Sequence, residues 1–119
     1  MSPHSCLEDI RRNLELVLEF TADTSYGEFA RDVRTQYAVI RCFEIAGEAT
    51  KRTPERVRLA CPSFPWRSMA AMRDKLIQGY ATVDASVLWA TIQDDVPRAM
   101  HQLPELQQKL EKSGPDAAD

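Results

Sequence analysis

Apolar residues recur at helical spacing along nearly the whole of this 119-residue chain, and this periodicity most constrains what it can fold into. One such stripe consists of Leu7, Ile10, Leu14, Val17 and Leu18. Only four glycines and few β-branched runs accompany the pattern, which leaves little room for a sheet. A chain of this length forms one domain around a single core. The sequence therefore predicts an all-α bundle of four to six helices.

The expected helices are separated by recognisable starts and stops. We expect four main helices, over residues 5–21, 32–52, 65–78 and from 85 onward, and two short ones near 26–30 and 54–60. Their predicted starts carry capping residues, namely Ser5 with Glu8, Ser25 with Glu28, Thr53 before Pro54, and Asp84. Gly79 suits the C-terminal stop of the third main helix, and Pro97 must kink or break the last one.

The helix over 32–52 has a predicted packing side that consists of Val33, Tyr37, Ile40, Phe43, Ala46 and Gly47. We expect residues 1–112 to form the helical domain and residues 113–119, SGPDAAD, to be a disordered tail. No apolar run approaches the ~20 residues needed to cross a bilayer, and the N-terminus becomes charged by Glu8. We therefore expect a cytoplasmic protein without membrane contact.

Cysteines and charge exclude several classes of function. Cys6, Cys42 and Cys61 are odd in number and widely spaced, so they predict buried thiols rather than disulfides or a metal site. His4 and His101 are the only histidines, and we expect neither a metal nor a cofactor. The net charge of −3 argues against a generic DNA-binding surface, although a local basic pocket for RNA stays compatible with it.

The segment over residues 72–84, MRDKLIQGYATVD, contains the residues best placed for chemistry. Arg73 falls on a mostly apolar helix face with Trp66, Ala70 and Ile77. A guanidinium there needs a partner, because burying an unpaired charge is costly. The partner is either a buried carboxylate or an anion such as phosphate bound in a cleft.

A second polar group lies on the helix over 32–52, where Arg41, Glu44 and Glu48 share a stripe. One interpretation is a solvated face. The alternative is that a carboxylate of this stripe orients Arg73 or contacts a partner subunit. Met69 and Met72 are expected to fill the core.

Three stretches, AVIRCFEIAGEATKR (38–52), FPWRSMAAMRDKLIQGYATVD (64–84) and VLWATIQDDVP (87–97), resemble the HepT-like branch of the HEPN superfamily in the same order. The resemblance implies a HEPN-like up-and-down bundle that dimerises around a shared cleft. It also implies metal-independent RNA cleavage and a toxin role, with a minimal nucleotidyltransferase as antitoxin. Arg73 matches the motif arginine, Tyr80 the tyrosine that accepts AMP, and Asp74 a polar motif position.

Gln78 occupies the position of the motif histidine. Metal-free RNA cleavage needs a base for the ribose 2′-hydroxyl and an acid for the leaving oxygen, and histidine serves both because its pKa is near 6.5. An amide cannot relay a proton. The resemblance therefore predicts RNA cleavage that is weakened or lost, with the fold and the cleft retained.

Three functional hypotheses follow. The first is a ribonuclease toxin with residual activity through Arg73, Tyr80 or a recruited histidine such as His101. The second is a catalytically silent dimer that still binds its nucleotidyltransferase partner. The third is an RNA- or nucleotide-binding protein that uses the arginine cleft without turnover.

Overall fold

The protein is an all-α bundle in a computed structural model that describes residues 2–78 and 84–112. Six helices are present in this part of the chain: α1 (Pro3–Phe20), α2 (Tyr26–Ala30), α3 (Val33–Arg52), α4 (Glu55–Ala60), α5 (Trp66–Gln78) and α6 (Ala85–Lys112). The predicted fold class is thus confirmed. None of the described helices is both long and apolar enough to cross a bilayer.

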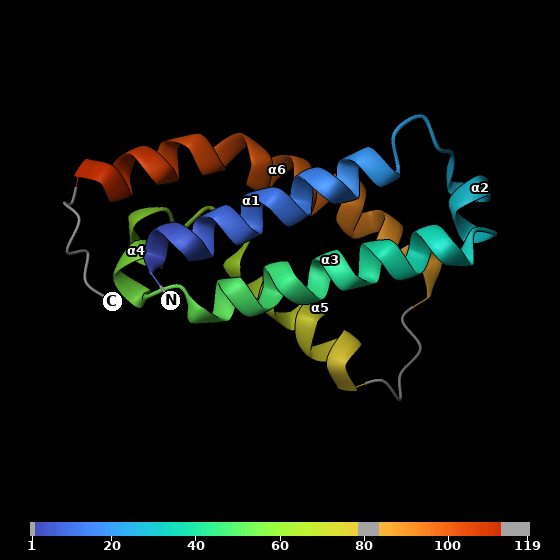
Figure 1. The fold of residues 1–119 in the computed structure, drawn as a ribbon, viewed down its shortest axis with the longest axis horizontal. Helices are drawn as coiled ribbons and strands as arrows, with labels where there is room; N and C mark the ends of the chain where they lie inside the picture. Colours follow the sequence, from blue (N-terminus) through green and yellow to red (C-terminus); the bar gives the residue numbers. More distant parts are fainter. Residues whose placement is uncertain (1, 79–83, 113–119) are drawn as a thin grey trace.

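Two antiparallel helices, α1 and α3, form the centre of the bundle, and α6 runs beside α1 (Figure 1). Helix α5 packs against α3. The short helices α2 and α4 lie at opposite ends of the molecule (Figure 1). The last residue of α5, Gln78, is exposed, whereas Met69 and Met72 in the middle of this helix are buried.

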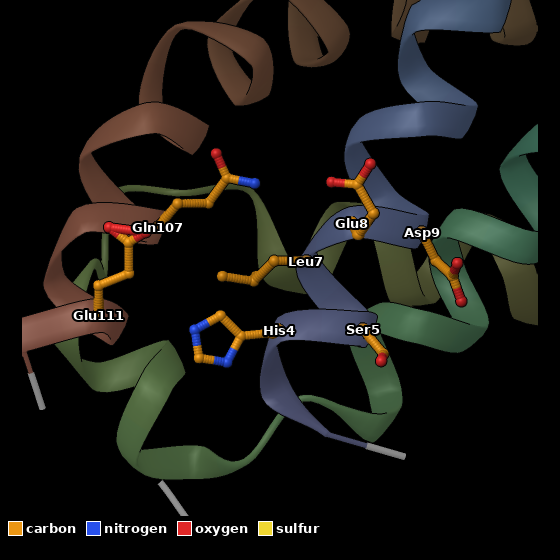
Figure 2. A pocket seen from close by; sticks show the side chains of 7 residues that line it. All are labelled: His4, Ser5, Leu7, Glu8, Asp9, Gln107 and Glu111. Atoms are coloured by element: carbon orange, nitrogen blue, oxygen red, sulfur yellow. The ribbon is translucent and has the colours of Figure 1, made fainter. Parts of the chain in front are cut away.

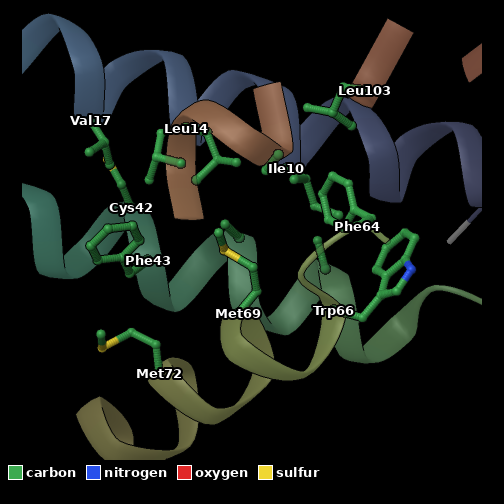
Figure 3. Packing of buried hydrophobic residues seen from close by; sticks show 14 of the residues in the cluster. Ile10, Leu14, Val17, Cys42, Phe43, Phe64, Trp66, Met69, Met72 and Leu103 are labelled. Atoms are coloured by element: carbon green, nitrogen blue, oxygen red, sulfur yellow. The ribbon is translucent and has the colours of Figure 1, made fainter. Parts of the chain in front are cut away.

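The core is formed where four helices meet the loop between α4 and α5. Leu14 of α1 lies on the side of Phe43 of α3, Ile10 lies near Phe64, and Met69 of α5 points into the space between α1 and α3 (Figure 3). Met72 is buried as well, so the predicted role of both methionines is confirmed. All three cysteines are buried and free, and burial raises the pKa of the Cys6 and Cys42 thiols. Burial and these raised pKa values make the thiols inert core residues.

Two predicted helix starts are wrong. Helix α1 begins at Pro3, because the side chain of Ser2 accepts a hydrogen bond from the backbone N–H of Ser5. A proline at the first helical position needs no hydrogen-bond partner for its nitrogen. Helix α4 has Pro54 as its N-cap without a side-chain bond, since the hydroxyl of Thr53 donates backward to the carbonyl of Ala49.

Other predicted starts are confirmed. Ser25 and Glu28 form a complete capping box at α2, and the carboxylate of Asp84 accepts hydrogen bonds from the first turn of α6. Helix α6 continues through Pro97, and its axis changes direction along its length (Figure 1). Gly79 and the predicted tail at 113–119 lie outside the described residues.

The predicted packing side of α3 is wrong at its N-terminal end. Val33 and Tyr37 are 59% and 70% exposed, whereas Phe43, Ala46 and Gly47 are buried. Leu18 of α1 is also 37% exposed. Val33 and Tyr37 therefore face solvent, and the buried side of α3 near its start is the one that carries Val39.

Candidate functional site

The site around Arg73 exists because α3 and α5 approach each other very closely at Gly47. A Cβ atom added at Gly47 would lie 2.2 Å from the Cβ of Arg73 and 2.8 Å from the carbonyl oxygen of Met69. Only glycine leaves room for this approach. The close crossing places the side chain of Arg73 directly beside Glu48, the next residue of α3.

Arg73 is paired with two carboxylates. Its Nη2 lies 3.1 Å from Oε1 of Glu48, and its Nη1 lies 3.2 Å from Oδ1 of Asp74. The side chain is 25% exposed, and its Nε is buried without a hydrogen-bond partner among the described residues. Glu48 of the predicted α3 stripe thus makes the contact with Arg73 that one interpretation of the stripe requires.

Both carboxylates also hold a second cation. Oε2 of Glu48 accepts a hydrogen bond from Nε of Arg52 at 2.9 Å. Oδ1 of Asp74 accepts one from Nζ of Lys51 at 2.8 Å, and this bond, followed by the one from Arg73, lowers the pKa of Asp74. These ion pairs are partly exposed, so solvent screens them and a competing anion can exchange with them.

Of these residues, Arg73, Glu48 and Arg52 line a pocket of about 280 Å³, which we call the arginine pocket. Its charged lining comes from α1, α3 and α5 and consists of Asp9, Arg41, Glu44, Glu48, Arg52 and Arg73. Arg41 pairs with Glu44 at 3.4 Å. The tertiary structure thus brings the predicted α3 stripe and Arg73 into one pocket. Three guanidiniums there can bind an oxyanion if the carboxylates release them.

Gln78 does not line the arginine pocket; it is exposed at the last residue of α5. Five residues of α-helix rotate a side chain by about 140° relative to Arg73, whereas the four-residue spacing to Ile77 keeps that residue in the pocket. Within one chain the arginine and the glutamine therefore point away from each other. Tyr80 lies outside the described residues.

Neither histidine lines the arginine pocket. His101 is exposed on α6, as predicted. His4 lies in a separate hollow of about 690 Å³ between the start of α1 and the end of α6, with Glu8 and Glu111 (Figure 2). No cluster of His, Cys, Asp or Glu in the described parts of the chain is arranged to hold a metal ion.

Sequence reasoning missed two contributors to the site. Lys51 was given no role, and nothing in its spacing shows that it reaches Asp74, 23 residues later. Asp9 was also missed, because α1 carried no recognised polar motif. By contrast, Glu48 and Arg52 lie four residues apart on one helix, a spacing that by itself indicates an ion pair, and the structure forms it.

The fold and this pocket define a small helical protein with a charged pocket in which three arginines are balanced by three carboxylates. Residues 10–112 match the family described as Ribonuclease HepT-like, and the chain belongs to that family. A Thermococcus cleftensis protein named "Probable ribonuclease HepT" is 50% identical over 91 residues, covering 76% of this chain and 83% of that protein.

More distant relatives cover more of the chain. A "Putative RNase" of Methanocaldococcus jannaschii is 37% identical over 105 residues, covering 88% of this chain and 87% of that protein. Another "Putative RNase", from Caldanaerobacter subterraneus, is 35% identical over 108 residues, which cover 91% of this chain and 96% of that protein. No solved structure matches this chain. The predicted family is therefore confirmed.

Proposed function

We propose that this chain is a HepT-like toxin homologue that binds RNA at the arginine pocket and cleaves it weakly or not at all. The observation that carries the proposal is the position of Arg73, half-buried at a pocket wall and held by Glu48 and Asp74. Such a guanidinium can bind a phosphate and stabilise charge that develops on it. Membership of the ribonuclease family names RNA as the source of that phosphate.

The second half of the proposal concerns proton transfer. General acid–base catalysis typically contributes ~10²–10⁴ in rate, and a glutamine amide supplies none of it. The arginine pocket also contains no histidine among its lining residues. Arg73 can therefore bind RNA and stabilise charge, whereas activation of the 2′-hydroxyl lacks a base.

The direct test compares RNA cleavage by the wild type and by Gln78→His, in EDTA to exclude adventitious metal ions. We expect little or no cleavage by the wild type and a gain of roughly a hundredfold or more in Gln78→His. Adding Arg73→Ala to Gln78→His should abolish the gain. Circular dichroism of each variant establishes that the helical fold is retained.

Each result bears on a separate part of the proposal. Strong cleavage by the wild type that Arg73→Ala removes would show that Gln78 does not limit activity. No cleavage by Gln78→His would show that these positions are not the catalytic site of this chain. If wild-type RNA binding is unaffected by Arg73→Ala, the arginine pocket is not the RNA site.

We also propose that the chain forms a homodimer in which two copies of α5 share the cleft. A shared cleft would explain why Arg73 and Gln78 diverge within one chain. Ile77 supports this arrangement, because it lines the arginine pocket and is 52% exposed. Light scattering of Ile77→Glu should then show a monomer, whereas the matched variant Leu18→Glu on α1 should stay dimeric. Dimeric Ile77→Glu would rule out this interface.

The partner implied by the family is a minimal nucleotidyltransferase antitoxin, and we propose that it transfers AMP to Tyr80. Co-expression with such a transferase from the same genomic neighbourhood, followed by intact-mass measurement, tests this. The expected result is a mass increase of one AMP that is absent from Tyr80→Phe. An adduct that persists in Tyr80→Phe would place the modification elsewhere.

A further inference from the structure

A second basic hollow lies next to the arginine pocket, and the proposed function does not use it. This α4–α5 groove, about 830 Å³ in volume, is enclosed by the end of α3, helix α4 and the start of α5. Its charged lining is Lys51, Glu55, Arg58 and Arg67, and its floor includes Phe64 and Trp66. Because Lys51 is paired with Asp74, the groove has two further cations, Arg58 and Arg67, against the carboxylate of Glu55, and this makes it locally positive in a chain whose net charge is −3.

The donors of the α4–α5 groove are suited to phosphate oxygens. Nε of Arg58 is buried and makes no hydrogen bond with any described residue, which is a costly arrangement unless an acceptor arrives. The first turn of α5, from Trp66 to Ser68, also lines the groove. Backbone N–H groups of a first helical turn favour an anion. Arg67 is exposed and can reach a ligand from the rim.

The groove and the arginine pocket share no lining residue, but both border α5. Ala70 lines the groove, and Arg73 lies one turn further on. Lys51 lines the groove and also bonds Asp74, the neighbour of Arg73. Arg67 and Arg73 are six residues apart, which places them about 9 Å apart along the helix axis and about 120° apart around it. One phosphate cannot bridge that distance, so the two arginines would hold different phosphates.

We infer that the α4–α5 groove binds the backbone of the same single RNA strand whose neighbouring phosphate occupies the arginine pocket. A strand that winds around α5 would contact Arg67 and Arg58 before it reaches Arg73. The groove thus acts as a positioning site that sets the orientation of the strand. The inference rests on the proposed RNA-binding function and assigns it a second phosphate site.

The test measures binding of a fluorescently labelled, 2′-O-methylated RNA strand, which keeps its phosphates but cannot be cleaved at the 2′-hydroxyl. Arg67→Glu is compared with Arg31→Glu, a matched reversal of an exposed arginine at the α2 end of the molecule. We expect Arg67→Glu to weaken binding roughly tenfold to a hundredfold. We expect a change of less than about threefold for Arg31→Glu.

Salt and length dependence separate a phosphate contact from a general charge effect. Arg67→Glu should make the slope of log K against log salt shallower by about 0.7 for each phosphate that the variant no longer binds. A dinucleotide, with one internucleotide phosphate, should bind the wild type and Arg67→Glu equally. If Arg67→Glu weakens binding of the dinucleotide as much as binding of the long strand, the inference is overturned.

RNA binding by the wild type, Arg73→Ala and Arg67→Glu separates an error about the groove from an error about RNA binding as a whole. If the wild type does not bind the strand, RNA binding itself is wrong and the inference falls with it. If Arg73→Ala weakens binding while Arg67→Glu matches Arg31→Glu, only the groove is misassigned. If Arg67→Glu spares RNA but weakens binding of a polyglutamate peptide, the groove is an acidic-peptide site and the RNA inference is wrong.

Discussion

Replacing Gly47 by alanine should destabilise the protein, although alanine is the better helix former. At a solvent-exposed position inside a helix, replacing glycine by alanine increases stability by about 0.5–1 kcal/mol. Here the new methyl carbon would lie 2.2 Å from the Cβ of Arg73, whereas nonbonded carbons need about 3.5–4.0 Å. Helices α3 and α5 must therefore separate by more than about 1 Å.

Such overpacking typically costs about 1–3 kcal/mol, and the short contact to the backbone oxygen of Met69 favours the upper end. After the gain in helix propensity we expect a net loss of about 2 kcal/mol and a Tm lower by roughly 5–10 °C. The separation would also lengthen the 3.1 Å contact between Arg73 and Glu48, so RNA binding should weaken as well.

The assay is urea and thermal unfolding at one protein concentration, because dimerisation would make stability depend on concentration. Gly27→Ala in α2 is the matched control, since its new Cβ would meet its nearest neighbours at 3.7 and 3.9 Å. We expect this control to be neutral or stabilised. If Gly47→Ala is as stable as the wild type or more so, the close crossing of α3 and α5 does not require glycine.

Two further predictions concern burial and charge. Val39→Ala removes two fully buried methyl groups from α3 and should lower the free energy of unfolding in urea by about 2–3 kcal/mol. Val33 is 59% exposed, so Val33→Ala should change this free energy by less than about 0.5 kcal/mol. Equal effects would contradict the exposed start of α3. Asp74→Asn should lower Tm at pH 7. The pKa of Asp74 is lowered in the folded protein, so its carboxylate stabilises the fold at pH values above its ordinary pKa of 3.8. The difference in Tm between Asp74→Asn and the wild type should shrink as the pH falls below 3.8. A difference in Tm that does not depend on pH would exclude the ion pair with Lys51 as its cause.

Helix starts were predictable where one local pattern was complete. Ser25 and Glu28 satisfy each other across three residues, so nothing distant needs to be known. Ser5 and Glu8 have the same spacing, but Ser2 before Pro3 already caps the helix. Two competing caps within one turn are separated by small energies, and the sequence pattern alone did not choose between them.

The candidate site was predictable in its members more than in its contacts. Arg73, Glu48 and Asp74 were chosen from helical faces and from the family resemblance, and the structure places them together. Lys51 was overlooked because its partner lies 23 residues away, on another helix. A contact of that kind depends on how two helices cross, and no local pattern encodes it.

The sequence by itself determined the helical class, the family and the absence of a histidine at position 78, because these depend on residue types and their spacing. Only the tertiary structure decided which charges meet. The close approach at Gly47 brings Glu48 to Arg73, and the end of α3, helix α4 and the start of α5 together line a basic groove. The physical reason is that helix periodicity is local, whereas a pocket is formed by packing between elements far apart in the chain.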